Sequence, residues 1–296
     1  MNQSIVGTIA KKEDGSEQVN YQNDDFPSYI HVGSVYPGAS WTNKPHYHED
    51  LEFITITEGK SGYNVNGEKI YLEKGDTLMV NSNQIHYSFT TTQEPCSYYI
   101  AILHPSLLCS SYYVQNHYVE RVTKNTNIPY VLIKHNDSQS ARVIEAVKDV
   151  IDSIDSELSI TISFLVLFKR IFQWCRANKN LMEYQTVVAP SDASFKNMLK
   201  FIHTRYADQI TLADIAKAGG VSKTHCNTLF KQFTGKTPME SLNRYRAERV
   251  AYYVTNTKLS MSEIAEKTGF NGASYMTETF KKVYGMAPRD YAGQKK

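Results

Sequence analysis

The sequence predicts an α+β protein, with an N-terminal antiparallel β-barrel plus dimerisation helices, followed by an all-α domain of two helix-turn-helix motifs. Three observations predict this architecture. Between residues 29 and 102, short alternating apolar stretches are separated by turn signals about every eight residues. Residues 140–177 keep the apolar period of helices, and the last third of the chain contains an internal repeat. A chain of 296 residues is long enough for two domains of ordinary size.

The composition is that of a globular protein. Hydrophobic residues make up 41% of the chain and charged residues 21%, which excludes a disordered or fibrous class. The four cysteines lie far apart and form no CxxC pair, so neither a disulfide framework nor a zinc knuckle is predicted. No signal-peptide pattern is visible, and the most apolar run, Leu158 to Phe168, is too short to cross a bilayer. We therefore expect a cytoplasmic protein that does not enter a membrane.

Charge is distributed unevenly along the chain. Residues 1–189 contain 15 Lys and Arg against 21 Asp and Glu, whereas residues 190–296 contain 17 against 9. The overall net charge of +2 conceals this difference. A basic C-terminal third predicts contact with a polyanion, and the acidic remainder is expected to have another role.

The predicted domain borders follow changes in sequence pattern. Residues 1–25 are polar and acidic and are predicted to form a flexible arm. Residues 26–180 contain the barrel and the helices that follow it. Residues 181–192 lose the helical period and contain Pro190, so they are predicted to be the linker to the all-α domain at 193–296.

Within the N-terminal part, Asn66-Gly67 stands between alternating apolar residues and predicts a hairpin turn. After the barrel, the segment around Val147 has one apolar stripe, as expected for a helix on a core. The segment from Leu158 to Cys175 is apolar nearly all round, so a helix there must be covered on two sides. One side is expected to face the barrel. The other side is predicted to form a homodimer interface. The alternative is a helix that lies entirely inside the core.

The internal repeat lies in the basic third. Residues 211–242 recur as residues 260–292, and each copy has the pattern helix, tight turn, helix. A small residue is expected where two helices cross closely, and a glycine four residues later permits a left-handed turn. The aligned pairs are Ala216 with Ala265, Gly220 with Gly269, Phe230 with Phe280, Gly235 with Gly285 and Pro238 with Pro288. Pro238 begins a helix between the copies, and this rigid connector would hold the two second helices about 34 Å apart, the spacing of successive major-groove turns.

Two stretches of the repeat resemble the AraC/XylS transcription regulators. They are GxTPxxxLNxxR, from Gly235 to Arg246, and IAxxxGF followed by FKKxxGxxPxxY, from Ile264 to Tyr291. The resemblance covers residues 194–292 and implies seven helices, with the second helix of each copy in the major groove of double-stranded promoter DNA. It also implies RNA polymerase as a partner if the protein is an activator.

Apolar residues define the buried side of each second helix and leave the other side for DNA. Asn, Thr, Ser and Glu near the helix start suit base edges, and lysines suit phosphates. The predicted DNA-binding residues are Lys223, Thr224, Asn227, Thr228, Lys231 and Lys236 in the first copy, and Ala273, Ser274, Thr277, Glu278, Lys281 and Lys282 in the second. Members of the family often carry Arg where this chain has Thr228 and Glu278. Glu278 is suited to accept a hydrogen bond from a cytosine amino group.

Three histidines and one glutamate in the barrel region form a candidate site. His46, His48 and Glu52 share parity, so on one extended strand they would project from one face, and His86 follows one hairpin later. The pattern HxHxxxExxxxxxG with a distant His resembles the cupin metal motif and implies a cupin-like barrel. Three His and one Glu suit a first-row divalent metal. Asn81–Asn83 stand where the family pattern has PxG.

Three interpretations of these four residues remain open: a divalent metal site, a pocket for an organic ligand, or structural packing. Trp41, Tyr47 and Tyr87 are also predicted to line the site, and aromatic faces beside polar groups suit a carbohydrate. We therefore expect a small-molecule effector, with a sugar as one candidate. No cofactor other than a divalent metal in this site is indicated.

The leading hypothesis is a ligand-responsive, DNA-binding transcription regulator that is not an enzyme. The barrel would bind the effector, the helices at 140–177 would pair two subunits, and the basic third would bind promoter DNA. The alternative is a metal-dependent cupin enzyme fused to a DNA-binding domain. That alternative needs a second acid–base pair, which is not evident in the sequence, so no catalytic residue is assigned.

Overall fold

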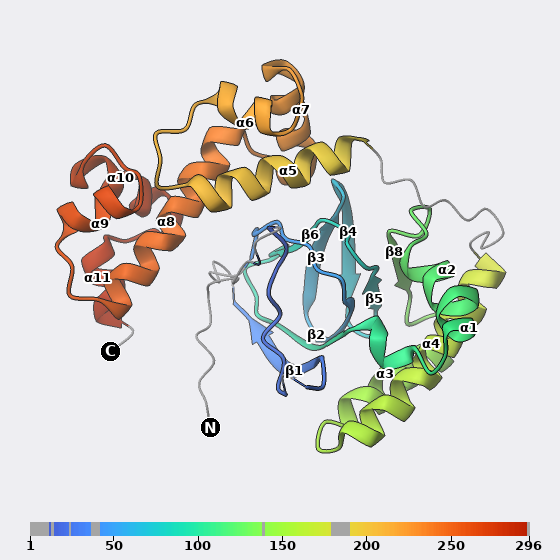
Figure 1. Ribbon diagram of the computed structural model, residues 1–296. Coiled ribbons are helices and arrows are strands. Elements are labelled where there is room, and N and C mark those ends of the chain that lie inside the picture. The colour runs from blue at the N-terminus through green and yellow to red at the C-terminus, as the bar shows by residue number, and fades with distance from the viewer. Residues whose placement is uncertain are drawn as a thin grey trace. The chain divides into compact units, whose positions relative to one another are not determined.

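The computed structural model describes residues 12, 15–23, 25–36, 42–137, 140–178 and 190–294 (Figure 1). By its contacts the chain divides into two compact units, which are described in turn. One unit is Gln18–Val188, and the other is Ala189–Lys296 together with Met1–Glu17. Most of the predicted linker at 181–192 lies outside the described residues, and residues 190–192 already belong to a helix.

The N-terminal unit contains two antiparallel sheets, as the sequence predicts. The strands are β1 (Ser28–Val35), β2 (Leu51–Glu58), β3 (Lys60–Val65), β4 (Glu68–Glu73), β5 (Thr77–Val80), β6 (His86–Phe89), β7 (Cys96–Leu103) and β8 (Tyr130–Ile133). The larger sheet has the order β1-β7-β2-β5-β8, and the smaller one has the order β4-β3-β6. Strand β8 lies beyond the predicted barrel region. The sequence does not predict this strand, because its four residues are too few to give a periodic signal.

The predicted hairpin joins β3 to β4. Asn66 and Gly67 both have left-handed φ angles, 51° and 92°. The side chain of Asn64 accepts a hydrogen bond from the Gly67 amide at 2.9 Å, and that of Asn66 accepts one from the Ile85 amide at 3.0 Å. The turn therefore has the geometry that Asn-Gly favours in two-residue hairpins, and it is also tied to the segment before β6.

Alternation along β2 separates two apolar layers. Leu51 and Phe53 belong to the cluster formed with the helices that follow the barrel, whereas Ile54 and Ile56 belong to the cluster between the two sheets. Glu52 has the parity of Ile54, so it projects into the space between the sheets, and it is 3% exposed. A carboxylate buried there is costly unless it is paired.

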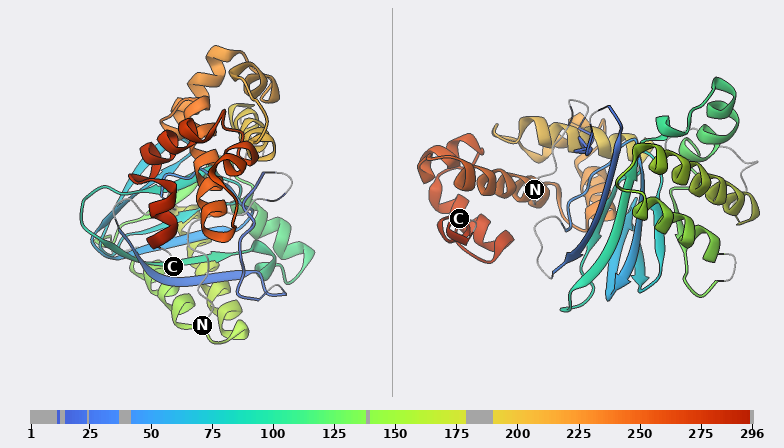
Figure 2. Two further views of the ribbon diagram at one scale, coloured as in Figure 1. Left: turned by 90° about the vertical axis from the view of Figure 1, so that its left-hand side faces the viewer. Right: turned by 90° about the horizontal axis from the view of Figure 1, so that it is seen from below.

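The two helices predicted after the barrel are α3 (Ala141–Asp152) and α4 (Glu157–Asn178). Figure 2 shows them against one side of the strands, and the ring of Phe164 in α4 packs edge-on against Phe53 of β2. The sequence does not predict a further helical stretch between β7 and β8, which consists of η1 (Pro105–Leu108), α1 (Tyr112–Val114), η2 (Gln115–Val119) and α2 (Glu120–Thr123). Each piece is too short to show a helical period.

Helix α4 has two apolar sides. The buried side, which belongs to the core, carries Ile160, Phe164, Leu167, Phe168, Ile171 and Cys175. The other side carries Leu158, Ile162, Leu165 and Val166, which are exposed by 71%, 54%, 43% and 42%. Among the described residues, α4 is the one helix long and apolar enough to cross a membrane. It has 22 residues and exceeds the predicted apolar run because it continues through Lys169 and Arg170.

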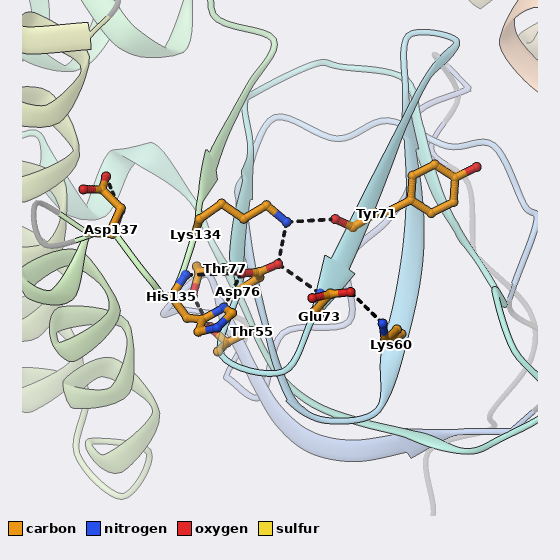
Figure 3. Close-up of polar contacts among 10 residues, drawn as sticks. Thr55, Lys60, Tyr71, Glu73, Asp76, Thr77, Lys134, His135 and Asp137 are labelled. Atoms are coloured by element: carbon orange, nitrogen blue, oxygen red, sulfur yellow. Dashed lines mark hydrogen bonds and ion pairs between the residues drawn. The ribbon is translucent and has the colours of Figure 1, made fainter.

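Asp76 ties β8 to the turn before β5 (Figure 3). Its carboxylate has no exposed surface, lies 2.7 Å from Nζ of Lys134, and accepts hydrogen bonds from the main-chain amides of Glu73 and His135. Nδ1 of His135 lies 2.9 Å from its other oxygen. Although burial raises the pKa of Asp76, these hydrogen bonds hold that pKa below its ordinary value. The carboxylate therefore stays charged and fastens the end of β8.

The C-terminal unit has seven helices among its described residues, the number that the resemblance implies. They are α5 (Pro190–Arg205), α6 (Leu212–Ala218), α7 (Lys223–Thr234), α8 (Pro238–Asn256), α9 (Met261–Lys267), α10 (Ala273–Tyr284) and α11 (Pro288–Gln294). Capping boxes at Thr211, Thr237 and Ser260 begin α6, α8 and α9. The pairs α6–α7 and α9–α10 are the two predicted helix-turn-helix motifs, and α8 connects them.

The tight turns of the two motifs depend on the predicted glycines. Gly220 and Gly269 have φ angles of 66° and 75°, in the left-handed region that glycine adopts without strain. Ala216 and Ala265 are 2% and 1% exposed, as expected where helices cross closely. A Cβ on Gly269 would lie 2.5 Å from the carbonyl oxygen of Tyr206. Glycine is therefore needed at 269 for the turn and also for the close approach of the two halves of this unit.

Candidate functional site

Four side chains converge between the two sheets of the N-terminal unit: His46, His48, Glu52 and His86. Each offers one ligand atom, and these atoms all lie within 4.8 Å of one another. Glu52 belongs to β2, His86 begins β6 in the other sheet, and His46 pairs with His86 as an isolated bridge. The prediction that the first three residues share one continuous strand is wrong, because β2 starts only after a bend at residues 49–50. They converge through that bend.

Main-chain contacts hold the histidines in place. The amides of His46 and His86 each donate to the carbonyl of the other, at 3.0 and 2.9 Å, and the amide of Asn83 donates to the carbonyl of His48 at 2.7 Å. Asn83 has a φ of 62°, a left-handed angle that glycine adopts readily and asparagine more readily than most residues. The departure from PxG at Asn81–Asn83 therefore leaves the turn intact.

The Nδ1 atoms of two histidines face main-chain carbonyls. Nδ1 of His46 lies 2.7 Å from the carbonyl oxygen of Lys44, and Nδ1 of His86 lies 2.8 Å from that of Gln84. A carbonyl oxygen only accepts, so in each ring Nδ1 carries the hydrogen and donates it. In a neutral ring Nε2 then presents a lone pair, which is the arrangement of histidines that bind a metal.

The Glu52 carboxylate faces two of the imidazoles. Its Oε2 lies 3.2 Å from Nε2 of His86 and 3.4 Å from Nε2 of His48. An oxygen and a nitrogen that are both acceptors repel one another at this distance unless a proton or a metal ion lies between them. Although burial raises the pKa of Glu52, the neighbouring His86 and His48 hold that pKa well below its ordinary value. The cluster therefore requires a proton on the histidine rings or a metal ion between these atoms.

The donor set fits a divalent metal ion. Three imidazoles and one carboxylate are the nitrogen and oxygen ligands that first-row divalent ions and zinc accept. His48, Glu52 and His86 are 2%, 3% and 1% exposed, so a bound ion would be shielded from water. Oε1 of Glu52 accepts a 3.1 Å hydrogen bond from the hydroxyl of Tyr63, which leaves Oε2 directed at the histidines. We call His46, His48, Glu52 and His86 the candidate metal centre.

Of the three aromatic residues predicted to line the site, Trp41, Tyr47 and Tyr87, neither of the two that the structure describes faces it. Tyr87 pairs with Asn64, whereas its neighbour His86 pairs with the inward-facing Val65, so Tyr87 projects from the opposite face of the smaller sheet. Its ring lies 6.5 Å from that of Phe89 on that face. The prediction that Tyr87 lines the candidate metal centre is therefore wrong.

The other two predicted aromatic residues have different outcomes. Tyr47 is 6% exposed and stands between His46 and His48 in an extended segment, so its side chain leaves the opposite side of that segment. Trp41 lies outside the described residues. Neither residue therefore adds to the argument for a carbohydrate.

Two further residues surround the centre. Tyr63, one of the aromatic residues that the sequence places around this motif, is buried and contacts Glu52, and its alternation with inward-facing Val65 on β3 is consistent with that position. Asp50 is 1% exposed, and its Oδ2 lies 3.5 Å from Nδ1 of His48. Asp50 has the same parity as His46 and His48, and this sequence signal could have placed it at the site.

The second helix of the first motif is α7. Cys226, Leu229, Phe230 and Phe233 are buried, as predicted. Of the predicted DNA-binding residues, Lys223, Thr224, Thr228 and Lys231 are exposed, and Asn227 and Lys236 are half-buried. The side chains of Asn227 and Thr228 donate hydrogen bonds to the carbonyls one turn earlier, at 3.0 and 3.1 Å. The outward face therefore has the composition that the sequence predicts, and contact with DNA remains a prediction.

The second helix of the second motif is α10. Met276 and Phe280 are buried as predicted, Val283 is half-buried, and Thr279 is also buried. Ser274, Glu278, Lys281 and Lys282 are exposed, and Ala273 and Thr277 are half-buried. Oε1 of Glu278 lies 2.7 Å from Nζ of Lys282, and this contact lowers the pKa of Glu278. The glutamate is thus a charged acceptor on a face whose other charges are lysines.

Arg246 of α8 fixes the first motif against the connector. Its Nε donates to the carbonyl of Tyr206 and its Nη2 to that of Asp208, both at 2.7 Å. The side chain of Gln209 donates to the carbonyl of Gly269 at 3.5 Å. The loop between α5 and α6 is thereby held to α8 and to the turn of the second motif, so the two motifs form one assembly. The predicted spacing between α7 and α10 remains a prediction.

Both regions match known protein families. Residues 215–294 match a helix-turn-helix domain, and residues 32–102 match a cupin domain. The uncharacterised HTH-type transcriptional regulator YdeC of Bacillus subtilis (strain 168) is 28% identical over 251 residues, which cover 83% of this chain and 84% of that protein. The chain is an AraC-type transcriptional regulator with a cupin domain.

Other proteins are similar to this AraC-type regulator over most of its length. The HTH-type transcriptional activator RhaS of Shigella dysenteriae serotype 1 (strain Sd197) is 21% identical over 267 residues, which cover 90% of this chain and 94% of that protein. A solved structure of an apo variant of ToxT from Vibrio cholerae strain SCE256 has a TM-score of 0.48 and 14% identity, and it covers 90% of this chain and 97% of that chain. The matches to YdeC and RhaS span both units, so the predicted class of transcription regulator is confirmed.

Proposed function

We propose that this AraC-type regulator senses a small molecule in its cupin barrel through a divalent cation held by the candidate metal centre. The observation that carries the proposal is the 3.2 Å contact between Nε2 of His86 and Oε2 of Glu52 in a buried site, which requires a proton or a metal ion between the two atoms. A cation relieves that contact, and the ligand set suits a first-row divalent ion. Such an ion, when bound, supplies open coordination positions for the oxygen atoms of an effector.

Neutral phenols beside the centre favour an uncharged polar effector. Burial, together with the charge of Glu52, raises the pKa of Tyr63 well above its ordinary value. Burial also raises the pKa of Tyr98 to about 12, and Glu52 is near enough to contribute. Both hydroxyls therefore remain protonated. That of Tyr63 already donates its hydrogen to Glu52, so that of Tyr98 is the one that can donate to an effector. Sugars present the matching oxygen acceptors, so a sugar is the first class of effector to test.

The basic C-terminal unit is proposed to bind double-stranded promoter DNA through α7 and α10. The outward lysines would contact phosphates, and the polar residues near the helix starts would contact base edges. An effector changes DNA affinity only if it binds two arrangements of the chain with different affinities. If the protein acts as an activator, RNA polymerase is the further partner.

The exposed side of α4 is proposed to pair two subunits. Leu158, Ile162, Leu165 and Val166 follow one another at helical spacing and are 42–71% exposed. A continuous apolar stripe of this kind marks an interaction surface. A homodimer accounts for the stripe without contact with lipid, and we expect it to act in the cytoplasm.

Metal analysis of protein purified without chelators tests the site. We expect about one first-row divalent ion per chain in the wild type, and its loss in the double variant His46→Ala/His48→Ala. The matched control His104→Ala/His117→Ala removes two histidines outside the candidate metal centre and should retain the ion. Wild-type protein without bound metal would contradict the metal site and leave a pocket of purely organic contacts.

A panel of sugars tests whether the N-terminal unit binds an effector. Both tryptophans, Trp41 and Trp174, belong to the N-terminal unit, so their fluorescence follows the unfolding of that unit alone. An effector at 100 times its dissociation constant should stabilise this unit by about 2.7 kcal/mol in the metal-loaded wild type and have no effect on the double variant. Chemical turnover of a panel member would instead favour the metal-dependent cupin enzyme.

A further inference from the structure

A buried carboxylate lies behind one of the histidines of the candidate metal centre. Asp50 is 1% exposed, and its Oδ2 lies 3.5 Å from Nδ1 of His48. The other nitrogen of that ring, Nε2, lies 3.4 Å from Oε2 of Glu52. Asp50 therefore contacts the imidazole from the side opposite the four ligand atoms, and it is a second carboxylate buried in this part of the barrel.

His48 differs in this respect from the other two histidines. Nδ1 of His46 and Nδ1 of His86 face neutral main-chain carbonyls, whereas Nδ1 of His48 faces a carboxylate. A carboxylate behind a ligating imidazole orients the ring and makes it a stronger ligand. The 3.5 Å contact is longer than a hydrogen bond. It should shorten when Nε2 binds a cation, because cation binding makes the ring N–H a stronger donor.

The second oxygen of Asp50 leads to the segment before the first strand. Oδ1 accepts a 2.7 Å hydrogen bond from the hydroxyl of Tyr21. Tyr21 belongs to residues 18–23, and its neighbour Gln22 donates from Nε2 to the carbonyl of Ile30 in β1 at 2.8 Å. Asn23 of the same segment donates a hydrogen bond to Oε1 of Glu157 in α4 at 3.4 Å. The segment 18–23 is thus attached to the rest of the N-terminal unit by three adjacent side chains, and the attachment at Tyr21 leads, through Asp50, to a ligand of the candidate metal centre.

We propose that Asp50 is a positioning residue for His48, and that Tyr21 couples occupancy of the metal centre to the segment 18–23. This inference rests on the proposed function, because it requires a cation at the centre. Cation binding draws Asp50 towards His48, and the Tyr21 hydroxyl follows the carboxylate that it is bonded to. Since coupling between two sites is reciprocal, loss of the Tyr21 hydrogen bond also weakens cation binding.

Calorimetric titration of the chelator-treated full-length chain with Mn²⁺ and with Zn²⁺ tests the positioning role. We expect Asp50→Asn to weaken binding by roughly 10–100-fold, as for other partners of metal-bound histidines. Tyr21→Phe removes only one hydroxyl and should weaken binding by a smaller factor. The matched control Tyr71→Phe removes the hydroxyl of a tyrosine that is 59% exposed on β4, and should bind as the wild type does. Tryptophan fluorescence of each metal-free variant shows whether it is folded, and Tyr21→Phe keeps the test valid if Asp50→Asn does not fold.

Amide hydrogen exchange of residues 18–23, measured with and without Zn²⁺, tests the coupling. Exchange should be slower in the loaded wild type, and the difference should disappear in Tyr21→Phe. The inference is overturned if the folded variants Asp50→Asn and Tyr21→Phe bind metal as tightly as the wild type. It is also overturned if amide exchange of residues 18–23 in the wild type is the same with and without metal. A wild type that binds neither ion overturns the proposed function instead, so the two failures are distinguishable.

Discussion

Nζ of Lys134 lies 2.7 Å from Oδ2 of Asp76, a carboxylate that has no exposed surface. Lys134 follows β8 directly, and Asp76 precedes β5, the strand with which β8 pairs. The contact therefore fastens the last strand of the larger sheet, and the chain that continues into α3 (Figure 3). A short strand at the edge of a sheet depends on such a contact, because it has few main-chain hydrogen bonds of its own.

We expect Asp76→Asn to destabilise the N-terminal unit by about 2–3 kcal/mol, because the hydrogen bonds to this charged group are lost or weakened. Chemical denaturation followed by tryptophan fluorescence measures this loss. The matched control Glu73→Gln breaks the exposed contact between Glu73 and Lys60 and should change stability little.

The effect of Asp76→Asn should also depend on pH. The pKa of Asp76 is lower in the folded chain, so its contribution to stability is complete above the ordinary carboxyl pKa of about 4 and is lost as the pH falls through the folded value. The difference in stability between wild type and variant should therefore shrink only below about pH 4. A difference that is the same at pH 7 and pH 3 would contradict this assignment.

Ile162→Glu should convert a dimer into a monomer. Ile162 is 54% exposed in the apolar stripe of α4, and a charge placed there would have to be buried in the proposed interface. Sedimentation of the full-length chain measures the change. Ala141→Glu, at an exposed position of α3, is the matched control and should remain dimeric. If the wild type is already a monomer at tens of micromolar, the stripe on α4 does not pair two subunits.

Asn227→Ala and Lys231→Ala should have different effects on DNA binding. Asn227 lies near the start of α7 and can contact a base edge, so its loss should relax sequence preference at one position, at a cost of about 1–3 kcal/mol there. Lys231 should contact a phosphate, so its loss should weaken binding to all sequences alike and reduce the salt slope by about one unit. Titrations over a range of salt concentrations distinguish the two. The opposite result would mean that α7 faces DNA with a different side.

Glu278→Gln should change base preference rather than affinity alone. A charged Glu278, held by Lys282, suits the amino group of cytosine, whereas glutamine suits adenine. Selection from a random duplex library should therefore show cytosine replaced by adenine at one position of the site. If the variant binds every sequence more tightly and prefers the same bases, Glu278 only repels the phosphates and does not contact a base.

The barrel and the two motifs could be predicted because their signals are local. Asn66-Gly67 defines one hairpin by its own conformational preference, and the repeated Gly220 and Gly269 mark turns that no other residue fits as well. Strand β8 could not be predicted in this way. It is four residues long and is fastened by Asp76, far away in the sequence, so no local period reveals it.

The members of the candidate metal centre could be predicted, but their arrangement could not. His46, His48 and Glu52 come together through a bend at residues 49–50 and through the pairing of His46 with His86, which depend on the whole barrel. The same strand alternation that brings His86 inward turns Tyr87 outward. Proximity in the sequence to a ligand was therefore a poor guide for the aromatic residues.

The affinity of the metal-loaded, full-length chain for DNA from its own upstream region shows whether an effector at the candidate metal centre controls DNA binding. Footprinting with and without the sugar panel measures it for the wild type and for His46→Ala/His48→Ala. We expect a sequence-specific footprint whose strength changes with effector in the wild type, and a footprint in the double variant that does not respond. An equal response in both proteins, or no sequence-specific footprint, would contradict it.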